Sequence, residues 1–568
     1  MEVNNSVKEF SRLSLMGIDA LGRKVTPVSE SRDKKYVGVF YFLWLGQHPT
    51  IQTDIRDIQK LLNMGEEGKK KLEDLSDGGQ FYFWGEPLYG YYNMADPWIL
   101  VRHLELLYNA GLDFICFDTT NCFGYTEVID KLLAMMLEYT KQGYNLPKVC
   151  FYTNTGASTN PQLIYEYFYQ PGKWDSLWFA PNGKPIIMGI TENSNNASDY
   201  TFYKINDEVM PRHLHDYFEV KESQWPLGEY NPNGVPWMSW EYPQRIHSGY
   251  IAVPVSQHAH STVDCSYSLM QPTSHRGYNN ITKKVEGDYR EGLSFQQMWD
   301  SAHQRRDEIH TVFVTGFNEW IAQKNRKNGS FCDGYNAAYS RDIDLMRGYY
   351  EDNYYMQLME NVRKFKWNPA IKGEYPVTQI DMTATDLEGQ FANVKAHYVD
   401  FKGDAMPRDY INMAGTFKYQ DNSNRNDITD IKVAQDGVNM YFMVKTADAI
   451  TEYNGTDTNW MNILIGDGNY VDTFAGYRYI INRNINGNRG SVEKYVNGAW
   501  QQVGEVQFKV NGNVMVVCVP LDMIGKSKDD LLIQFKVADN VTNQNDIMDY
   551  YITGDTAPLG RVGFGYGY

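Results

Sequence analysis

The sequence lacks the features that mark several classes of protein. It has no uninterrupted apolar run of about 18 residues, the length that predicts a membrane-spanning helix. Six cysteines are present but form no Cys-x-x-Cys pair, which argues against zinc ribbons and thiol redox motifs. The Gly-x-Ser-x-Gly elbow of serine hydrolases and the His-Glu-x-x-His helix of zinc proteases are also missing.

Basic residues are in deficit, since 53 Lys and Arg stand against 70 Asp and Glu, and the net charge is −17. This balance argues against nucleic acid and anionic membrane surfaces as partners. Residues 1–35 are polar and contain no apolar signal-peptide core. We expect a secreted, periplasmic or cell-surface protein whose signal peptide is absent from this sequence. The alternative is a cytoplasmic protein.

Aromatic residues, by contrast, make up 14% of the 568 residues. A chain of this length is too long for one core, so we expect at least two domains. Aromatic side chains in excess are typical of carbohydrate sites, although a large core also absorbs many of them.

After an N-terminal extension at residues 1–33, strand-like and helix-like segments alternate. Residues 96–110 illustrate a helix, with Asp96 as N-cap and Pro97 at the first helical position. The alternation predicts a (β/α)8 TIM-type barrel over residues 34–370. A doubly wound open sheet is the alternative, which the lack of a Gly-rich phosphate loop disfavours. The expected strands are 36–45, 112–117, 148–153, 185–190, 217–221, 235–240, 250–256 and 311–315.

Around residue 375 the helical period disappears and short alternating runs take over, separated by Asn, Asp and Gly turns. This texture predicts an antiparallel β-sandwich over residues 375–568. The expected strands are 431–434, 438–445, 460–465, 477–482, 506–510, 514–519 and 531–537.

The stretch 311–323, TVFVTGFNEWIAQ, carries the leading catalytic candidate. Its first half predicts a buried strand, so Glu319 follows directly at the strand's carboxyl end, where a barrel presents its active site. Glycoside cleavage needs a second carboxyl group, for which Glu241 and Asp118 compete. Asp118 has a structural reading as a turn cap, and Glu241 has one as an ion pair with Arg245.

Other polar and aromatic residues follow the same strand ends and are candidates for binding a sugar. They are His48, Asn154, Trp225, Trp240, His258, Asn318 and Trp320. The pairs His213-x-His215 and His258-x-His260 have strand spacing, but no acidic triad lies near them in sequence, so we predict no metal there.

Several of these segments resemble the barrels of glycoside hydrolase families 71 and 99, in particular a bacterial branch with a second β domain. The resemblance covers residues 36–367 and is carried by DPWILVRHLELLYNAGLDFICFDTTN, VPVSQHAH, VTGFNEWIAQ and FCDGYNAAYSRDIDLMRGYYEDNYYMQLMENVRKFK. Family 99 comprises retaining endo-α-mannosidases and α-mannanases whose catalytic pair lies in an Asn-Glu-Trp-x-Glu motif.

Laid on this sequence, the resemblance implies Glu319 as the first acid of that motif, whereas the second position falls at Ala322. Alanine is neither an acid nor a base, so the family mechanism does not carry over whole, and mannosidase specificity is not implied. A replacement carboxyl from another strand favours the wider spacing of inverting enzymes, roughly 6.5–9.5 Å.

The C-terminal part resembles carbohydrate-binding module family 9 in the segments NRNDITDIKVAQDGVNMYFMVKTAD and LLIQFKVADN and in the ending GDTAPLGRVGFGY. The resemblance implies sugar stacking on aromatic side chains, with Trp460 and Trp500 as candidates or as core residues. It also allows calcium in this domain, while no other cofactor is expected.

Together these patterns predict a glycoside hydrolase that cleaves O-glycosidic bonds in a poly- or oligosaccharide, as in polysaccharide degradation. The alternative is a non-catalytic carbohydrate-binding protein on a degenerate hydrolase barrel.

Overall fold

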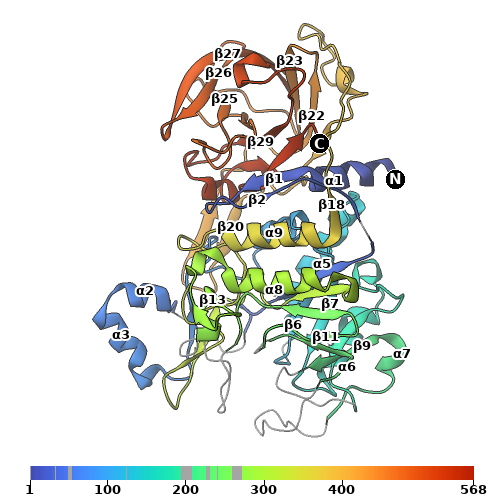
Figure 1. The fold of residues 1–568 in the computed structure, drawn as a ribbon, viewed down its shortest axis with the longest axis vertical. Coiled ribbons are helices and arrows are strands. Elements are labelled where there is room, and N and C mark those ends of the chain that lie inside the picture. The colour runs from blue at the N-terminus through green and yellow to red at the C-terminus, as the bar shows by residue number, and fades with distance from the viewer. Residues whose placement is uncertain are drawn as a thin grey trace.

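The computed structural model describes residues 2–31, 33–48, 54–122, 124–192, 208–224, 230–238, 241–258 and 272–568. In this part of the chain, nine strands form a sheet that nearly closes into a barrel (Figure 1). Their order is β10 (Gly234–Pro236), β9 (Glu219–Gln224), β8 (Ile186–Gly189), β7 (Lys148–Thr153), β6 (Phe114–Thr119), β4 (Tyr36–Tyr41), β15 (Thr311–Val314), β12 (Tyr250–Val253) and β11 (Ile246–His247).

Neighbours from β10 to β9 and onward to β12 are parallel, and only β11 runs antiparallel to its neighbour within the described sheet. Each of the eight strand runs expected before residue 316 overlaps one of the parallel strands. At the open edge, β10 and β12 lie against each other.

Helices pack outside this sheet but do not follow every strand. The longer ones are α4 (Pro97–Asn109), α5 (Thr126–Lys141), α8 (Leu293–Gln304) and α9 (Asn353–Lys366), and the shorter ones are α2 (Ile58–Asn63), α3 (Glu66–Glu73), α6 (Asn160–Ile164) and α7 (Leu214–Tyr217). Within the described ranges no helix separates β9 from β10 or β10 from β12. The described residues of these two connections therefore depart from a regular strand–helix alternation, and the expected barrel is matched in its parallel strands.

Aromatic rings fill the inside of the barrel-like sheet. Phe40 packs edge-on against Tyr152 and Phe313, with ring centroids 5.5 and 5.9 Å away. Phe114 lies opposite Gly38, where an added Cβ would fall 2.2 Å from the Phe114 ring, so glycine makes room for it. These rings fill the interior of the sheet below the carboxyl ends of its strands.

Among the described residues, thirteen strands form a second sheet, most of it built from residues 397–566, and all of its neighbouring strands are antiparallel. Each of the seven predicted runs overlaps one of its strands. Its strands are β19 (His397–Val399), β22 (Ile428–Gln435), β23 (Asn439–Thr446), β24 (Asn462–Gly466), β25 (Tyr479–Asn486), β26 (Arg489–Val496), β27 (Ala499–Asn511), β28 (Val514–Pro520), β29 (Ile533–Asp539), β30 (Asp555–Ala557), β31 (Gly563–Tyr566), β1 (Leu15–Ile18) and β2 (Lys24–Val25).

The N-terminal segment joins this second sheet, an arrangement that its sequence pattern does not indicate. Helix α1 (Glu2–Ser14) leads into β1, which pairs with β31 near the other end of the chain. Figure 1 shows α1 and β1 between the two sheets, beside α9.

The remaining strands of the described chain form small sheets: β5 (Phe81–Phe83) with β16 (Ile321–Lys324) and β17 (Phe331–Cys332), β3 (Val28–Ser31) with β18 (Trp367–Pro369), β13 (Tyr278–Asn279) with β14 (Lys284–Val285), and β20 (Arg408–Ile411) with β21 (Lys418–Asp421).

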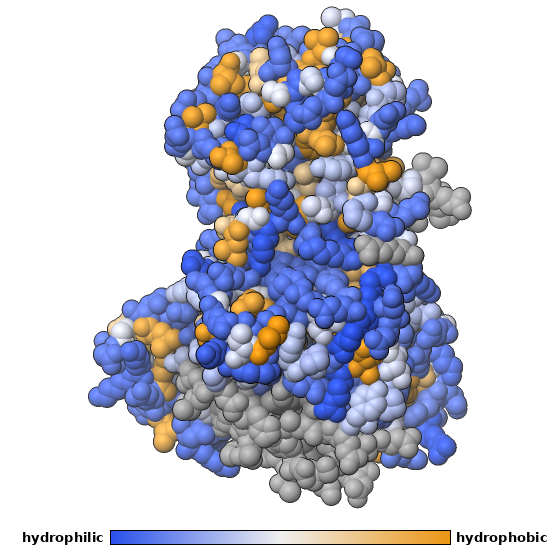
Figure 2. Space-filling view, in the orientation of Figure 1, coloured by the Kyte–Doolittle hydropathy of each residue, from blue (hydrophilic) through white to orange (hydrophobic). Residues whose placement is uncertain are grey.

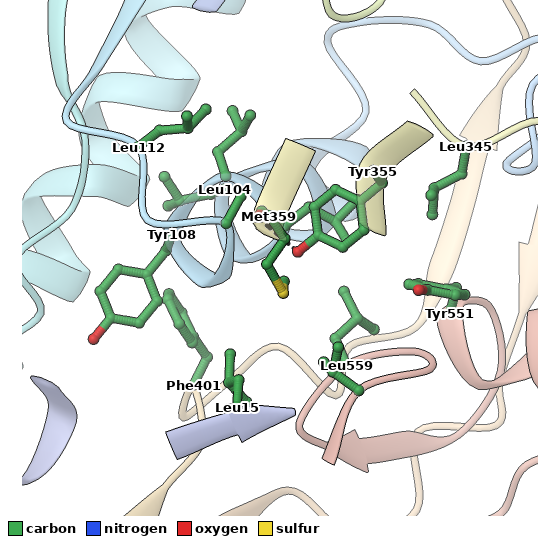
Figure 3. Close-up of a cluster of buried hydrophobic side chains, with 14 of the residues drawn as sticks. Leu15, Leu104, Tyr108, Leu112, Leu345, Tyr355, Met359, Phe401, Tyr551 and Leu559 are labelled. Atoms are coloured by element: carbon green, nitrogen blue, oxygen red, sulfur yellow. Dashed lines mark hydrogen bonds between the residues drawn. The ribbon is translucent and has the colours of Figure 1, made fainter. Parts of the chain in front are cut away.

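We call β4 through α9 the barrel part, and the second sheet with its connections the C-terminal part. An apolar contact joins them, in which Leu104 of α4 and Tyr355 and Met359 of α9 face Tyr551 and Leu559 (Figure 3). On the outer face in Figure 2, by contrast, hydrophobic residues are scattered among hydrophilic ones. None of the helices among the described residues has the length and apolarity needed to cross a membrane.

A buried ion pair strengthens this contact. Arg561 donates from Nε and a terminal nitrogen to the two oxygens of Asp352, at 2.6 and 2.9 Å. Tyr551 donates to the same carboxylate at 3.0 Å, and the Asp352 side chain is fully buried. The two parts are therefore held by charge-assisted hydrogen bonds as well as by apolar packing.

We expect Arg561→Met to lower the free energy of unfolding by about 3–5 kcal/mol, because it leaves the Asp352 charge buried without its partner. Urea unfolding of the full chain measures this loss. Arg290→Met is the matched control, since the side chains of its pair with Asp288 are 51% and 36% exposed and such pairs contribute below about 1 kcal/mol. Equal effects of the two variants would contradict the structural weight given to the buried pair.

Candidate active site

A cavity of about 140 Å³ lies at the carboxyl ends of the barrel strands. Carboxyl groups dominate its lining in the described chain, and the acidic residues are Asp118, Glu319, Asp333 and Asp342. Arg341, His258, Asn121 and Asn154 add polar groups, and Phe40, Trp237 and Met238 add apolar walls. The lining thus combines acids with an aromatic surface, as a sugar site requires.

Strand alternation places two of these polar residues. Asp118 is two and four residues beyond Cys116 and Phe114 on β6, which both pack inside the barrel, so its side chain points the same way. Asn154 follows Cys150 and Tyr152 in the same manner after β7. Asn154 is fixed by Ser223 of β9, whose hydroxyl donates to its Oδ1 at 3.1 Å.

A tight turn after β15 positions Glu319. Its backbone N–H donates to Asp342 Oδ1 at 2.8 Å, and Ile343 and Asp344 donate to the carbonyl of Phe317 at 2.9 and 2.7 Å. Gly316 permits this approach, because an added Cβ would lie 2.8 Å from the carbonyl oxygen of Arg341. The segment 341–344 is thereby held against the strand end that carries Glu319.

The electrostatics of the cavity favour protonated acids. Burial, reinforced by the nearby charges of Asp333, Asp342 and Asp118, raises the pKa of Glu319 well above its usual 4.5. Burial also raises the pKa of Asp118 to about 6, although hydrogen bonds from the Thr120 N–H and hydroxyl oppose the shift. Burial raises the pKa of Asp342 to about 7, opposed by the Glu319 N–H.

Arg341 and Asp333 complete the charged groups. Burial lowers the pKa of the Arg341 guanidinium, while the carboxylates of Asp333, Glu319 and Asp342 act in the opposite direction. Asp333 has a positive φ of 63°, a conformation that non-glycine residues adopt at a cost. It directly follows Cys332, which is disulfide-bonded.

Sequence reasoning missed Asp333, Arg341, Asp342 and Trp237 as lining residues. The signals were present, because Asp-Gly at 333–334 marks a turn and Arg-Asp-x-Asp at 341–344 is a charged cluster in an otherwise apolar stretch. Only the fold brings these residues to the end of β15.

Glu241 is not among the residues that line this cavity. Its two carboxylate oxygens each lie 3.0 Å from Arg245 Nε, and the side chains of this pair are 39% and 42% exposed. This arrangement is the structural ion pair that the sequence allowed. A surface pair four residues apart is a local contact that strand counting does not reveal.

Three residues that the sequence predicted as sugar contacts, Asn318, Trp320 and His48, instead contact other residues of the protein and do not line the cavity. Asn318 is fully buried and exchanges hydrogen bonds with the Phe42 backbone, at 2.9 and 3.0 Å. Trp320 is fully buried, stacks on Trp84 at 4.2 Å and donates to Asp344 at 2.9 Å. His48 packs edge-on against Trp44, 4.3 Å between centroids, outside the lining of the cavity.

The residues of the predicted site thus divide. Asp118, Asn154, His258 and Glu319 come together at one cavity, whereas Glu241, His48, Asn318 and Trp320 do not line it. Trp225, Trp240 and His260 lie outside the described residues.

Ala322, where the family motif would carry its second acid, faces an apolar cluster. It is fully buried on β16, opposite Tyr82 of β5, and packs with Ile58, Leu72 and Phe331. A carboxylate at this position would be desolvated without a partner among these neighbours. Besides Glu319, the acids that line the cavity in the described chain are Asp118, Asp333 and Asp342.

No protein-family model matches the sequence, and the search of curated proteins found no match. Among solved structures, the chain is similar to the family 99 endo-α-mannosidase of Bacteroides thetaiotaomicron, at 16% identity and a TM-score of 0.30, over 58% of this chain and 97% of that one. It is also similar to a glycoside hydrolase-like protein, at 12% identity and a TM-score of 0.29, over 61% and 97% of the two chains. At these values the likenesses do not by themselves establish a shared activity.

The raised pKa of Asp118 has a consequence for stability. In the folded state the pKa of Asp118 is about 6, above the ordinary 3.8, so the folded state binds this proton more tightly than the unfolded state does. The free energy of unfolding therefore decreases as the pH rises from about 4 to about 6. We expect Asp118→Asn, which keeps an acceptor for Thr120, to stabilise the protein by roughly 1–3 kcal/mol at pH 7 and by little at pH 4.

Urea unfolding at pH 4 and pH 7 measures this difference. Asp529→Asn is the control, since that side chain is 82% exposed. If Asp118→Asn destabilises the chain at pH 7 as much as at pH 4, the carboxylate is not penalised by burial.

Proposed function

We propose that the chain is a glycoside hydrolase that cleaves O-glycosidic bonds of a poly- or oligosaccharide on a (β/α)8-type barrel, with a C-terminal β-sandwich. The observation that carries the proposal is the convergence of Asp118 and Glu319 on one cavity, each with a raised pKa. Glycoside cleavage uses such a pair, one carboxyl as general acid and one as base or nucleophile.

Glu319 is the general acid in this proposal. Three neighbouring carboxyl groups oppose its ionisation, so it keeps a proton for the leaving oxygen near neutral pH. Asp118 is the ionised partner, since a pKa of about 6 leaves it mostly charged at pH 7. Asp342 is a positioning residue, because its carboxylate holds the Glu319 backbone.

The remaining lining residues bind the sugar. Trp237 and Phe40 offer apolar faces to a pyranose ring, while Asn121, Asn154 and His258 offer hydrogen-bonding groups to its hydroxyls. The substrate is then a neutral or weakly charged glycan, since four of the ionisable lining groups in the described chain are acids and two, His258 and Arg341, are basic.

The second candidate function is carbohydrate binding without catalysis. The apolar surroundings of Ala322 favour it, because the position of the family's second acid has become part of the core. The C-terminal part offers limited support for a sugar-stacking role. Trp460 is buried and donates to the carbonyl of Thr451 at 2.7 Å, as a core residue does.

We further propose that the protein works in an oxidising compartment, at the cell surface, in the periplasm or outside the cell. The disulfide of Cys332 beside the cavity supports this location, since disulfides persist in such compartments.

Glu319→Gln tests the catalytic assignment. With the purified full chain and a panel of polysaccharides and host-type glycans, we expect the variant to bind glycan as the wild type does but to release reducing ends at least 100-fold more slowly, because general acid catalysis is lost. Glu241→Gln is the matched comparison and should keep wild-type turnover. Activity of Glu319→Gln within about tenfold of wild type would reject Glu319 as the acid, and wild-type binding without any release would favour the binding protein.

The pH dependence tests the roles of the two carboxyl groups. We expect kcat/KM to rise as pH increases through about 6, where Asp118 ionises, and to fall at higher pH, where Glu319 loses its proton. Initial rates between pH 4 and pH 9 measure this profile. Asp118→Asn should remove the rise from whatever activity remains, and a rise that persists in that variant would exclude Asp118 as the ionised partner.

A further inference from the structure

A second group of acidic residues lies where α4 of the barrel part meets the C-terminal part, away from the cavity. One oxygen each of Glu105, Asp400 and Asp404 lie within 4.8 Å of one another, and so do oxygens of Asp404, Asp427 and Asp555. Glu105 belongs to α4, Asp400 and Asp404 to the connection between β19 and β20, Asp427 precedes β22, and Asp555 begins β30. Asp404 is shared by both sets.

Several oxygens of this cluster have no donor. Glu105 Oε2, Asp400 Oδ2 and Asp555 Oδ1 are buried and make no hydrogen bond with the described residues. The three residues are 0%, 6% and 1% exposed, so bulk water does not reach them freely. The other oxygen of Glu105 accepts from the Leu559 N–H at 3.2 Å, and that of Asp555 accepts from the Ile428 N–H at 2.6 Å. The unsatisfied oxygens are thus held in place by their bonded partners.

Nearby basic groups do not balance the charge. Arg102 lies 3.5 Å from Asp404, and the buried Lys536 donates to the carbonyl of Pro558. Lys402 also acts electrostatically on Asp427. Five carboxyl groups therefore face three basic side chains among the described residues, and each unbalanced buried charge is costly.

We propose that this cluster binds calcium, with Asp404 as the shared ligand, and that the ion fastens the barrel part to the C-terminal part. Calcium prefers six to eight oxygen ligands at about 2.3–2.6 Å, so oxygens that lie within 4.8 Å of one another are close enough to share one ion. Neither set contains cysteine or histidine, the ligands that zinc prefers.

The position of the cluster gives the ion a structural role. Leu104 and Phe401, the sequence neighbours of Glu105 and Asp400, lie in the apolar contact of Figure 3, together with Leu559. Calcium would join α4 to three segments of the C-terminal part at the edge of that contact, which carry Asp400 and Asp404, Asp427, and Asp555. The site is independent of the catalytic proposal, since none of its residues lines the cavity.

Calcium itself is the probe for the test. The purified full chain is freed of metal with EDTA, and its thermal unfolding is followed with no addition, with calcium and with magnesium. We expect calcium to raise Tm by at least about 5 °C in a concentration-dependent manner, magnesium to act only at much higher concentration, and metal analysis to find about one or more calcium ions per chain. No shift with calcium, or an equal response to magnesium, would overturn the assignment.

Variants locate the site. Asp404→Asn should abolish the calcium-dependent shift. Asp427→Asn, at the less buried side of the cluster, should weaken calcium binding at least tenfold and serves if Asp404→Asn does not fold. The exposed Asp529→Asn should respond to calcium as wild type does. A metal-free Asp404→Asn or Asp427→Asn that melts above the wild type in saturating calcium would show that the carboxyl groups share protons instead, and would overturn the proposal.

Discussion

Burying carboxyl groups is the physical constraint on which this structure depends. A desolvated carboxylate costs several kcal/mol unless a counter-charge, a proton or a metal ion neutralises it. The chain uses the first solution where Arg561 meets Asp352, with both side chains almost fully buried. At Glu319 the surrounding acids favour the second solution, the proton. For the cluster around Asp404 we propose the third.

The candidate active site follows from the way the barrel interior is filled. Phe40, Tyr152 and Phe313 occupy the space between the strands, so the next inward positions, Asp118 and Thr315, lie above an apolar floor. That floor is what raises the pKa of the acid next to it. The same packing thus raises the pKa of these acids and lowers the free energy of unfolding at neutral pH. Such a loss of stability is common where activity requires a strained or desolvated group.

The two parts of the molecule are joined by long-range contacts. In the C-terminal part, β1 pairs with β31, so two neighbouring strands of its sheet come from opposite ends of the sequence. Arg408 of β20 lies 2.8 Å from Asp96, the N-cap of α4, and both are buried. An element that begins a barrel helix is thus held by the C-terminal part. This arrangement explains why Asp96 has two roles, as a helix cap and as half of a buried ion pair.

The sequence by itself determined the order and type of the main elements, because hydrophobic period and turn residues are local properties. Helix α4 begins at Asp96 and Pro97 as predicted, and the parallel strands fall in the predicted runs. It also indicated that Asp118, Asn154 and Glu319 would share one end of the barrel, since parallel strands present their carboxyl ends together. Only the tertiary structure decided that Asp333, Arg341 and Asp342 join them, and that Glu105 of α4 meets Asp400 and Asp404 of the C-terminal part. Strand period fixes the direction of a side chain, but the neighbours that it meets come from other segments of the chain, and no local pattern encodes that meeting.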